Sequence, residues 1–180
     1  MSIEIEKKYR LTDELEREVR STLIEFGAEF VGEDFEENIL FSNDELFQRN
    51  SIVRIRRTQK ATLLTFKQRL ASTSGAKQQV EHETDVSDAD ALRSIIESIG
   101  LNAVAVYEKR RRTYKFRSVE IVLDELPFGQ FMEIEGSISA IAEAEMLLGI
   151  EDLEVEHETY PRLTMKHGKK IGNVVEARFE

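Results

Sequence analysis

A short charged segment, Glu4-Ile5-Glu6-Lys7-Lys8, lies close to the start of the chain. Successive side chains of a β-strand point to opposite faces, so Ile3 and Ile5 share one face of this segment. The other face carries Glu4, Glu6 and Lys8. Two carboxylates and an ammonium group on one face are unusual for a strand. The question is therefore whether the other strands also carry charges at alternate positions.

Hydrophobic periodicity predicts a single α+β domain with mostly antiparallel strands. A helix is expected after Thr12, a suitable N-cap, and it should end at Gly27. Further helices are expected near 87–100, with Ser87 as the cap, and near 137–149. Strands are expected near 28–42, 51–58, 62–70, 78–86, 102–117, 118–125 and 130–136, with a polar turn at 43–44 and a loop at 71–76. The predicted domain covers 1–180, with a core of about 1–160 and a basic tail at 161–180.

Composition excludes several classes of function. Thirty-five acids against 25 bases give a net charge of −10, which argues against a general nucleic-acid or membrane binder. The sequence has no cysteine, so neither a disulfide framework nor a thiol-ligated metal is available. No apolar run approaches the length of a membrane span, and the first residues lack the pattern of a signal peptide. We expect a cytoplasmic protein.

In the later strands, too, the charged residues occupy alternate positions, opposite to the apolar residues. In Val53-Arg54-Ile55-Arg56 the arginines alternate with apolar residues, and Met132-Glu133-Ile134-Glu135 repeats the acidic pair of the first strand. The polar face collected in this way contains seven acids and six bases. They are Glu4, Glu6, Glu81, Glu83, Asp124, Glu133 and Glu135 with Lys8, Arg54, Arg56, Lys67, Lys109 and Arg111.

For any single strand, a charged face turned to water is an ordinary explanation. The whole set is explained better by a closed barrel with its charges inside, where acids and bases offset part of one another's desolvation cost. Clustered carboxylates suit Mg²⁺ or Mn²⁺, which prefer oxygen ligands. Arginine and lysine suit phosphate oxygens, and a polyphosphate needs many cations along a groove.

The pattern also resembles the CYTH superfamily, or triphosphate tunnel metalloenzymes. Glu4-x-Glu6-x-Lys8 is similar to the ExExK signature of that family, and further elements follow it in order over residues 3–136. These are Arg54-x-Arg56, Leu64-Thr65-Phe66-Lys67, Glu81-x-Glu83, Lys109-x-Arg111 with Tyr114, Asp124, and Gly129-x-Phe131-Met132-Glu133-Ile134-Glu135, followed later by Thr159-Tyr160.

The resemblance implies an eight-stranded antiparallel barrel that forms a tunnel, with helices outside, and a divalent-metal-dependent reaction on a triphosphate. Glu4, Glu6 and Lys8 would be catalytic. The metal, Mg²⁺ or Mn²⁺, would be held by Glu4, Glu6, Asp124, Glu133 and Glu135, with Glu81 and Glu83 as further candidates. The phosphates would contact Lys8, Arg54, Arg56, Lys67, Lys109 and Arg111. Lys166, Lys169 and Lys170 are candidates for a lysine that closes one end, and a homodimer is compatible with the resemblance.

The reaction stays open at this point. We expect hydrolysis of inorganic triphosphate, ATP or thiamine triphosphate, and the alternative is a class IV adenylyl cyclase that makes cyclic AMP and pyrophosphate from ATP. A polyphosphate-binding module without turnover and a purely structural barrel of salt bridges are further alternatives. The spacing of residues indicates no pocket for an adenine ring.

Overall fold

The computed structural model describes residues 2–71 and 77–180. The described strands are β1 (Ser2–Leu11), β2 (Glu29–Ser42), β3 (Ser51–Arg57), β4 (Thr62–Arg69), β5 (Lys77–Asp85), β6 (Asn102–Phe116), β7 (Val119–Leu126), β8 (Gly129–Glu135), β9 (Lys169–Ile171) and β10 (Val174–Ala177). The described helices are α1 (Asp13–Glu25), α2 (Asp44–Gln48), α3 (Ala89–Ser98), α4 (Ile138–Leu148) and α5 (Tyr160–His167). No helix of the described part is long and apolar enough to cross a bilayer.

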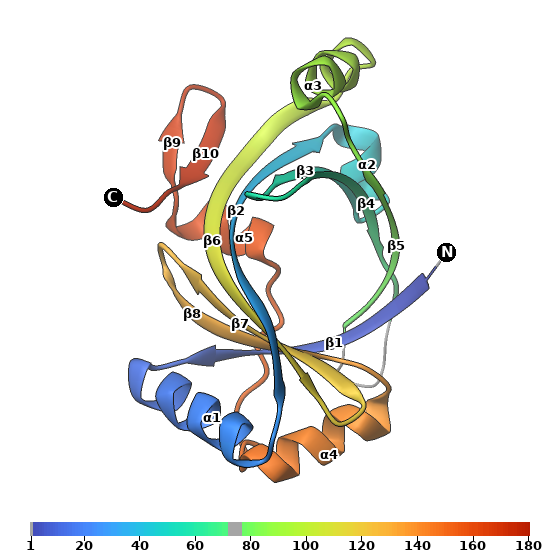
Figure 1. Cartoon of the computed structure of the whole chain (residues 1–180). Helices are drawn as coiled ribbons and strands as arrows, with labels where there is room; N and C mark the ends of the chain where they lie inside the picture. The colour runs from blue at the N-terminus through green and yellow to red at the C-terminus, as the bar shows by residue number, and fades with distance from the viewer. Residues whose placement is uncertain (1, 72–76) are drawn as a thin grey trace.

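Eight strands form a ring that closes on itself (Figure 1). Their order is β2-β3-β4-β5-β1-β8-β7-β6, and the pairing of β2 with β6 joins the two ends. All pairings within the ring are antiparallel. The hairpin of β9 and β10 lies beside β6, to which β10 is parallel. The predicted α+β fold with an antiparallel tunnel of eight strands is confirmed.

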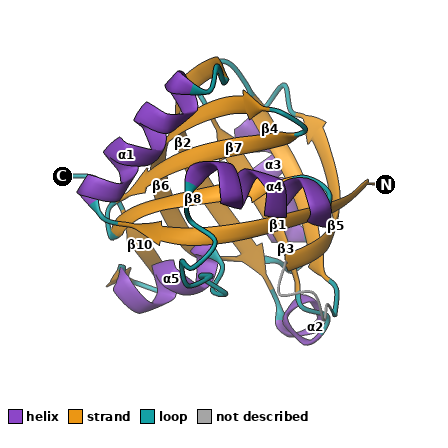
Figure 2. Cartoon of the chain, turned by 90° about the horizontal axis from the view of Figure 1, so that it is seen from below, coloured by secondary structure: helices purple, strands orange, loops and turns teal. Residues whose placement is uncertain are grey.

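The outer face of the ring is apolar where helices cover it. Leu23 of α1 and Ile141 of α4 are fully buried, and they belong to the same cluster as Ile121 and Ile134 of the sheet. Figure 2 shows α1 and α4 lying across this outer face. Burying these side chains outside leaves the opposite parity of each strand, including its charges, to face the interior of the ring.

Local capping explains most helix boundaries. The Thr12 hydroxyl accepts a hydrogen bond from the Leu15 amide at 3.2 Å, so α1 begins where the sequence predicts. The cap of α3 is Asp88, whose carboxylate accepts from the amides of residues 90 and 91, and the prediction of Ser87 is wrong by one residue. An aspartate oxygen at Asp88 satisfies two amides of the first turn, which fixes the start there.

Two regions contain structure that periodicity did not reveal. The predicted polar turn at 43–44 is the start of the five-residue helix α2, which is capped by Asn43 and is too short to show a helical repeat. The predicted tail contains α5, capped by Thr159, and the β9–β10 hairpin. Apart from residue 71, the predicted loop at 71–76 lies outside the described residues.

Candidate functional site

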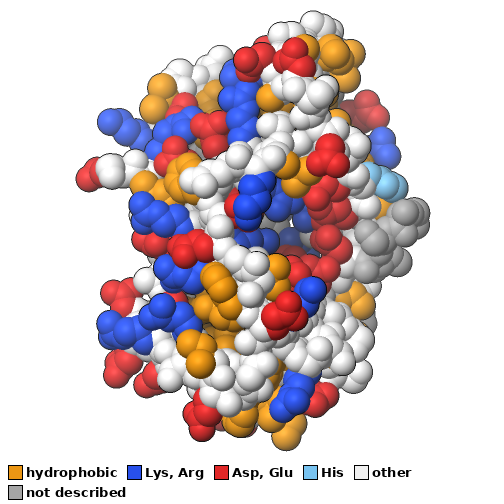
Figure 3. Space-filling model, viewed as in Figure 1, with side chains coloured by type: hydrophobic (Ala, Val, Ile, Leu, Met, Phe, Trp, Pro, Cys, Tyr) orange, Lys and Arg blue, Asp and Glu red, His pale blue; other side chains and the backbone are white. Residues whose placement is uncertain are grey.

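A cavity of about 760 Å³ occupies the interior of the ring. Figure 3 shows an opening into the molecule with basic side chains in its depth and acidic side chains along one rim. Of the charged residues predicted to face inward, all except Asp124 line this cavity. Those that line it are Glu4, Glu6, Lys8, Arg54, Arg56, Lys67, Glu81, Glu83, Lys109, Arg111, Glu133 and Glu135.

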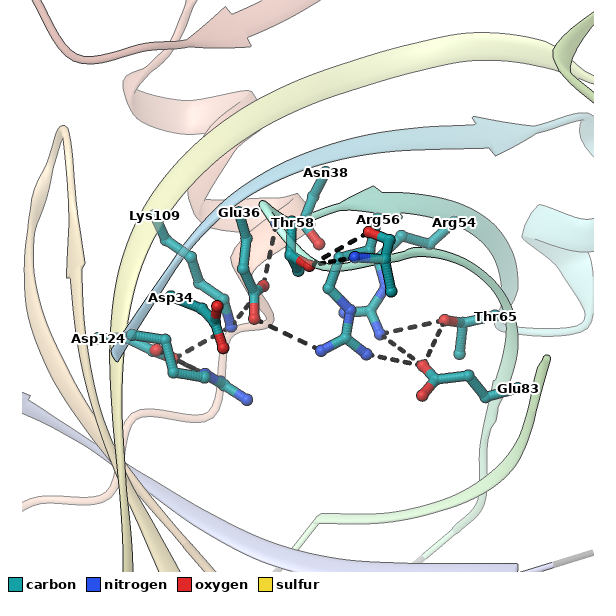
Figure 4. A network of polar contacts seen from close by, with 12 residues as sticks. Asp34, Glu36, Asn38, Arg54, Arg56, Thr58, Thr65, Glu83, Lys109 and Asp124 are labelled. Carbon is teal, nitrogen blue, oxygen red and sulfur yellow. Dashed lines mark hydrogen bonds and ion pairs between the residues drawn. The ribbon is translucent and has the colours of Figure 1, made fainter. Parts of the chain in front are cut away.

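Arg54 and Arg56 point into the cavity from β3 (Figure 4). The Arg56 guanidinium donates to Glu83 at 2.7 Å, and that of Arg54 donates to the Thr65 hydroxyl at 3.2 Å. The Nε atoms of both arginines are buried and have no hydrogen-bond partner. A buried N–H without an acceptor is costly, so an added acceptor near either group would be favourable.

Glu36 of β2 is a buried carboxylate that sequence reasoning missed. Its oxygens lie 3.3 Å from the Lys109 ammonium and 3.5 Å from the Arg56 guanidinium, and the Asn38 amide donates to it at 3.4 Å (Figure 4). Burial alone would raise the pKa of Glu36, but Lys109 and Arg111 outweigh it and hold that pKa well below its usual range. Glu36 is therefore ionised and fixes two cations of the site.

The sequence of residues 33–38 does not show which side chains face inward, because acids stand at adjacent positions as well as at alternate ones. Only the pairing of Glu36 with Lys109 and of Asn38 with Tyr107 across β2 and β6 shows which residues face inward. Alternation of 36, 38 and 40 was the one available signal.

Asp124 is fully buried behind the cavity wall, where it is held by cations. The Arg111 guanidinium makes two hydrogen bonds to it, at 2.7 and 2.6 Å, and the Tyr160 hydroxyl donates to it at 2.8 Å. Burial alone would lower the pKa of Arg111, but Asp124 outweighs it and raises that pKa well above its usual range. Arg111 faces the cavity, whereas its neighbour Arg110 pairs with Glu125 on the exposed outer face.

Lys8 and Lys109 are almost completely buried ammonium groups. The Nζ atom of Lys8 donates to the Glu158 carbonyl at 3.0 Å and lies 3.5 Å from the Glu133 carboxylate. It also lies 3.8 Å from the centre of the Tyr160 ring, a cation–π contact. Burial lowers the pKa of both lysines, and the neighbouring Arg111 lowers that of Lys109 further. Tyr160 was noted in the sequence only as part of the family resemblance, and the structure makes it a central contact.

A second part of the cavity is acidic. Glu4 accepts from the Gln79 amide at 2.7 Å and from Lys67 at 3.4 Å, and Lys77 lies 2.7 Å from Glu6. Burial alone would raise the pKa of Glu4, but hydrogen bonds with Glu81 and Gln79 and the charge of Lys67 lower it to about 2. Lys77 and Gln79 were not predicted as site residues.

Glu135 completes this acidic region. It is paired in the sheet with Glu6 on one side and with Glu120, another cavity residue absent from the predicted site, on the other. Burial, followed by the charges of Glu4, Glu6 and Glu120, raises the pKa of Glu135 to about 7. The region therefore holds more negative charge than its own bases offset.

Glu81 and Glu83, from β5, connect the two regions. Glu81 forms an ion pair with Lys67 and lies 3.9 Å from Arg54. Burial and the neighbouring Glu4 raise the pKa of Glu81, whereas Arg56 lowers that of Glu83 against the effect of burial. Both side chains orient bases of the site.

The residues of the acidic region fit a divalent cation by their chemistry. Carboxylate oxygens are the ligands of hard cations, and the raised pKa of Glu135 marks a place where added positive charge would be favourable. In the part of the chain that the structure describes, no three acidic or histidine side chains already converge as a ligand set. Binding a metal would therefore require rotation of the carboxylates. Of the predicted ligands, Asp124 and Glu133 hold Arg111 and Lys8 in this structure.

The candidates for a closing lysine lie elsewhere. Lys166 pairs with Glu158 at 2.7 Å on the exposed side of α5, and Lys169 and Lys170 are exposed on β9. None of the three lines the cavity described above. From α5, the cavity is lined instead by Tyr160, Pro161, Arg162 and Met165.

Comparison with known proteins places this geometry in a family. A family model described as the CYTH domain matches residues 2–170. A relative from Methanocaldococcus jannaschii, whose name gives it provisionally as an adenylate cyclase, is 27% identical over 150 residues, which are 81% of this chain and 83% of the relative. A solved structure from Pyrococcus horikoshii OT3 is 26% identical with a TM-score of 0.77, and the match covers 91% of this chain and 98% of that one.

A structure from Hippeastrum shares the fold at lower identity. It is 18% identical with a TM-score of 0.68, the match covers 96% of this chain and 99% of that one, and its description is of an adenylyl cyclase with a dominant triphosphatase activity. With a ring of eight strands, a charged interior and a family model that spans residues 2–170, the chain belongs to the CYTH domain family.

Proposed function

We propose that the protein is a divalent-metal-dependent triphosphatase that holds its substrate inside the ring. The observation that carries this proposal is the gathering of bases in one cavity: Arg54 and Arg56, whose Nε–H groups lack acceptors, together with further bases that include Lys8, Lys67, Lys109 and Arg111. Triphosphate offers oxygens at several positions along its length, as such a row of cations requires. The CYTH family contains triphosphatases and adenylyl cyclases, and its triphosphate tunnel enzymes depend on divalent metals in general.

We assign phosphate binding to the bases of the lumen: Lys8, Arg54, Arg56, Lys67, Lys109 and Arg111. Arg54 and Arg56 still have free donors, whereas Arg111 and Lys109 are positioned by Asp124 and Glu36. Burial lowers the pKa of Lys8 and Lys109. A phosphate bound beside them would favour the charged form of both ammonium groups.

Glu4, Glu6 and Glu135 would hold the metal, Mg²⁺ or Mn²⁺, in our proposal, while the roles of Asp124 and Glu133 as ligands stay predictions. When bound, such a metal neutralises phosphate charge and makes a water molecule more acidic. In hydrolysis, a water molecule would attack the terminal phosphorus, the bond from this phosphorus to its bridging oxygen would break, and orthophosphate and a diphosphate would leave with release of a proton. The bases of the lumen stabilise the charge that develops on the transferred group.

An adenylyl cyclase reaction is the second candidate, and the name of the archaeal relative favours it. In that reaction the ribose 3′-hydroxyl of ATP attacks the α-phosphorus, and pyrophosphate leaves. A module that binds polyphosphate without turnover would have less need of the acids Glu4, Glu6 and Glu135. A cytoplasmic location and a homodimer stay predictions from the sequence.

A product analysis tests the proposal. Purified protein is incubated with inorganic triphosphate, thiamine triphosphate or ATP, with Mg²⁺ or Mn²⁺, and with EDTA as the metal-free control. Orthophosphate from at least one substrate, abolished by EDTA, is the expected result. Cyclic AMP and pyrophosphate from ATP would replace the triphosphatase by the cyclase. If every substrate stayed intact with both metals, the enzyme proposal would be wrong.

A further inference from the structure

Tyr160, the first residue of α5, lines the cavity beside the bases of the strands. The Thr159 hydroxyl caps the helix by accepting from the Arg162 amide at 3.4 Å, and Pro161 follows in the first turn. A capped helix start with a proline in its first turn has little freedom in its backbone. The direction in which the Tyr160 side chain points is therefore set by the start of α5.

Two other aromatic rings pack against Tyr160. The centre of its ring lies 5.4 Å from that of Phe131 of β8, in an edge-to-face arrangement, and 6.1 Å from that of Tyr107 of β6. Tilted arrangements at these distances are favourable for aromatic pairs. Only 6% of Tyr160 is exposed, so its ring is a buried and well-packed part of the cavity wall.

The ring of Tyr160 contacts the ammonium group of Lys8. The Nζ atom of Lys8 lies 3.8 Å from the ring centre, and it donates at 3.0 Å to the carbonyl of Glu158, two residues before Tyr160. The short segment that leads into α5 thus contacts Lys8 twice. The Nζ atom of Lys109 lies 5.4 Å from the same ring centre. Because both ammonium groups are buried, the attraction of the ring for them is stronger than it would be in water.

The hydroxyl of the same side chain contacts a second base indirectly. It donates to the buried Asp124 carboxylate at 2.8 Å, and Asp124 also accepts two hydrogen bonds from Arg111. Lys8 and Arg111 belong to β1 and β6, which are not adjacent in the ring. No direct strand pairing therefore fixes these two bases relative to each other, whereas Tyr160 is connected to both.

We propose that Tyr160 is a positioning residue of the phosphate site: its ring holds the Lys8 ammonium at the cavity, and its hydroxyl holds Arg111 through Asp124. This role rests on the function proposed above, in which both bases bind phosphate. It adds a residue of α5 to a set of bases that all come from strands. A leucine could fill much of the same space, but it would provide neither contact.

Three variants distinguish the two contacts from simple packing. Tyr160→Phe keeps the ring and removes the hydroxyl, whereas Tyr160→Leu removes both. Tyr114→Leu is the matched control, since Tyr114 is as deeply buried but belongs to the outer core and does not line the cavity. For each protein, KM and kcat are measured with the triphosphate that the wild type hydrolyses. The dissociation constant of inorganic triphosphate is measured by calorimetry in EDTA.

We expect Tyr160→Leu to raise KM and the dissociation constant at least ~10-fold, the scale of a cation–π contact between desolvated groups, and to change kcat less. Tyr160→Phe should raise both constants by a smaller factor, because the ring stays beside Lys8. Tyr114→Leu should lower the melting temperature and keep both constants. An unchanged dissociation constant in Tyr160→Leu, or an equal loss of affinity in Tyr114→Leu, would overturn the positioning role. If Tyr160→Leu does not fold, an unchanged constant in Tyr160→Phe would overturn it.

A double-mutant cycle tests whether Tyr160 acts through Lys8. Lys8→Met removes the ammonium group and keeps a long side chain. If the ring acts by holding Lys8, Tyr160→Leu should weaken the binding of inorganic triphosphate far less in the Lys8→Met protein than in the wild type. Strictly additive losses of affinity would show that the ring does not act through Lys8.

The outcomes also separate the positioning role from the proposed function. If the wild type neither hydrolyses nor binds any triphosphate, both are wrong. If a triphosphate is hydrolysed and all Tyr160 variants keep the wild-type KM, the triphosphatase stands and the positioning role does not. If inorganic triphosphate binds without turnover and the cycle is non-additive, the positioning role stands and the hydrolase does not.

Discussion

Arg111 holds Asp124 through two parallel hydrogen bonds of 2.7 and 2.6 Å, although the two residues are 13 positions apart and lie on adjacent strands. The Tyr160 hydroxyl, from α5, donates to the same carboxylate. The side chain of Asp124 has no exposed surface, so its charge depends entirely on these partners. The pair fixes the guanidinium that also contacts Glu133 at 2.9 Å at the wall of the cavity.

Replacement of Asp124 by asparagine should destabilise the metal-free protein. Arg111 and Lys109 would lose a buried counter-charge, and breaking a buried ion pair on one side costs about 3–5 kcal/mol. Urea unfolding in EDTA measures the loss. Glu125→Gln, which removes an exposed carboxylate from the outer face of β7, is the control. A normal stability in EDTA, together with loss of metal binding, would favour the predicted role of Asp124 as a ligand.

Arg56→Gln should weaken substrate binding. The change removes a guanidinium that faces the cavity, and hydrogen bonds to charged groups contribute about 1.5–3 kcal/mol, so KM for the preferred triphosphate should rise roughly 10- to 100-fold. Arg57→Gln is the matched control, because Arg57 is the next residue on β3 and pairs with Asp90 on the outer side at 2.8 Å. Equal effects of the two substitutions would remove phosphate binding from Arg56.

Glu4→Gln should distinguish a catalyst from a binding module. The substitution keeps the shape of the side chain but removes a charge from the proposed metal site. We expect kcat to fall at least ~10-fold, the scale of effect when the support of a metal site is altered. Inorganic triphosphate should still raise the melting temperature of the variant, since the bases of the lumen are unchanged. A variant with full turnover would exclude Glu4 from the metal site.

Glu135 should make the metal-free protein less stable as the pH rises. Its pKa is about 7 in the folded protein against an ordinary value of 4.5, so the folded state binds this proton more tightly than the unfolded state does. The contribution of Glu135 to stability is therefore fully present below about pH 4.5 and is lost as the pH rises through about 7. In EDTA, Glu135→Gln should gain melting temperature relative to the wild type between pH 5 and pH 8.

The metal should reverse this dependence. A divalent cation at the carboxylates favours the ionised form of Glu135, so Mg²⁺ or Mn²⁺ should raise the melting temperature of the wild type more at pH 8 than at pH 5. The same addition should affect Glu135→Gln less. An identical metal response of the two proteins at both pH values would remove Glu135 from the proposed ligand set.

Local alternation of residues was enough to predict which faces of most strands are charged. Side chains alternate along a strand with a period of two. Once the apolar face of each strand was buried, Glu4 and Glu6 had to share the opposite face of the first strand, and Arg54 and Arg56 the opposite face of theirs. The same local rule identified α1 through its cap at Thr12. These features need only a few residues of sequence around each position, and the structure places the predicted side chains in one cavity, apart from the buried Asp124.

The further residues that line the site could be identified only from the pairing of strands that are distant in the sequence. The direction of the Glu36 side chain becomes clear only from the pairing of β2 with β6, where Glu36 lies opposite Lys109, which is distant in the sequence. Tyr160 reaches Lys8 from the other end of the sequence. Phe47 of α2 and Met165 of α5 also line the cavity, although the two helices are far apart in the sequence. No local pattern relates such positions, because closure of the ring, and not the period of any one strand, sets the distance between them.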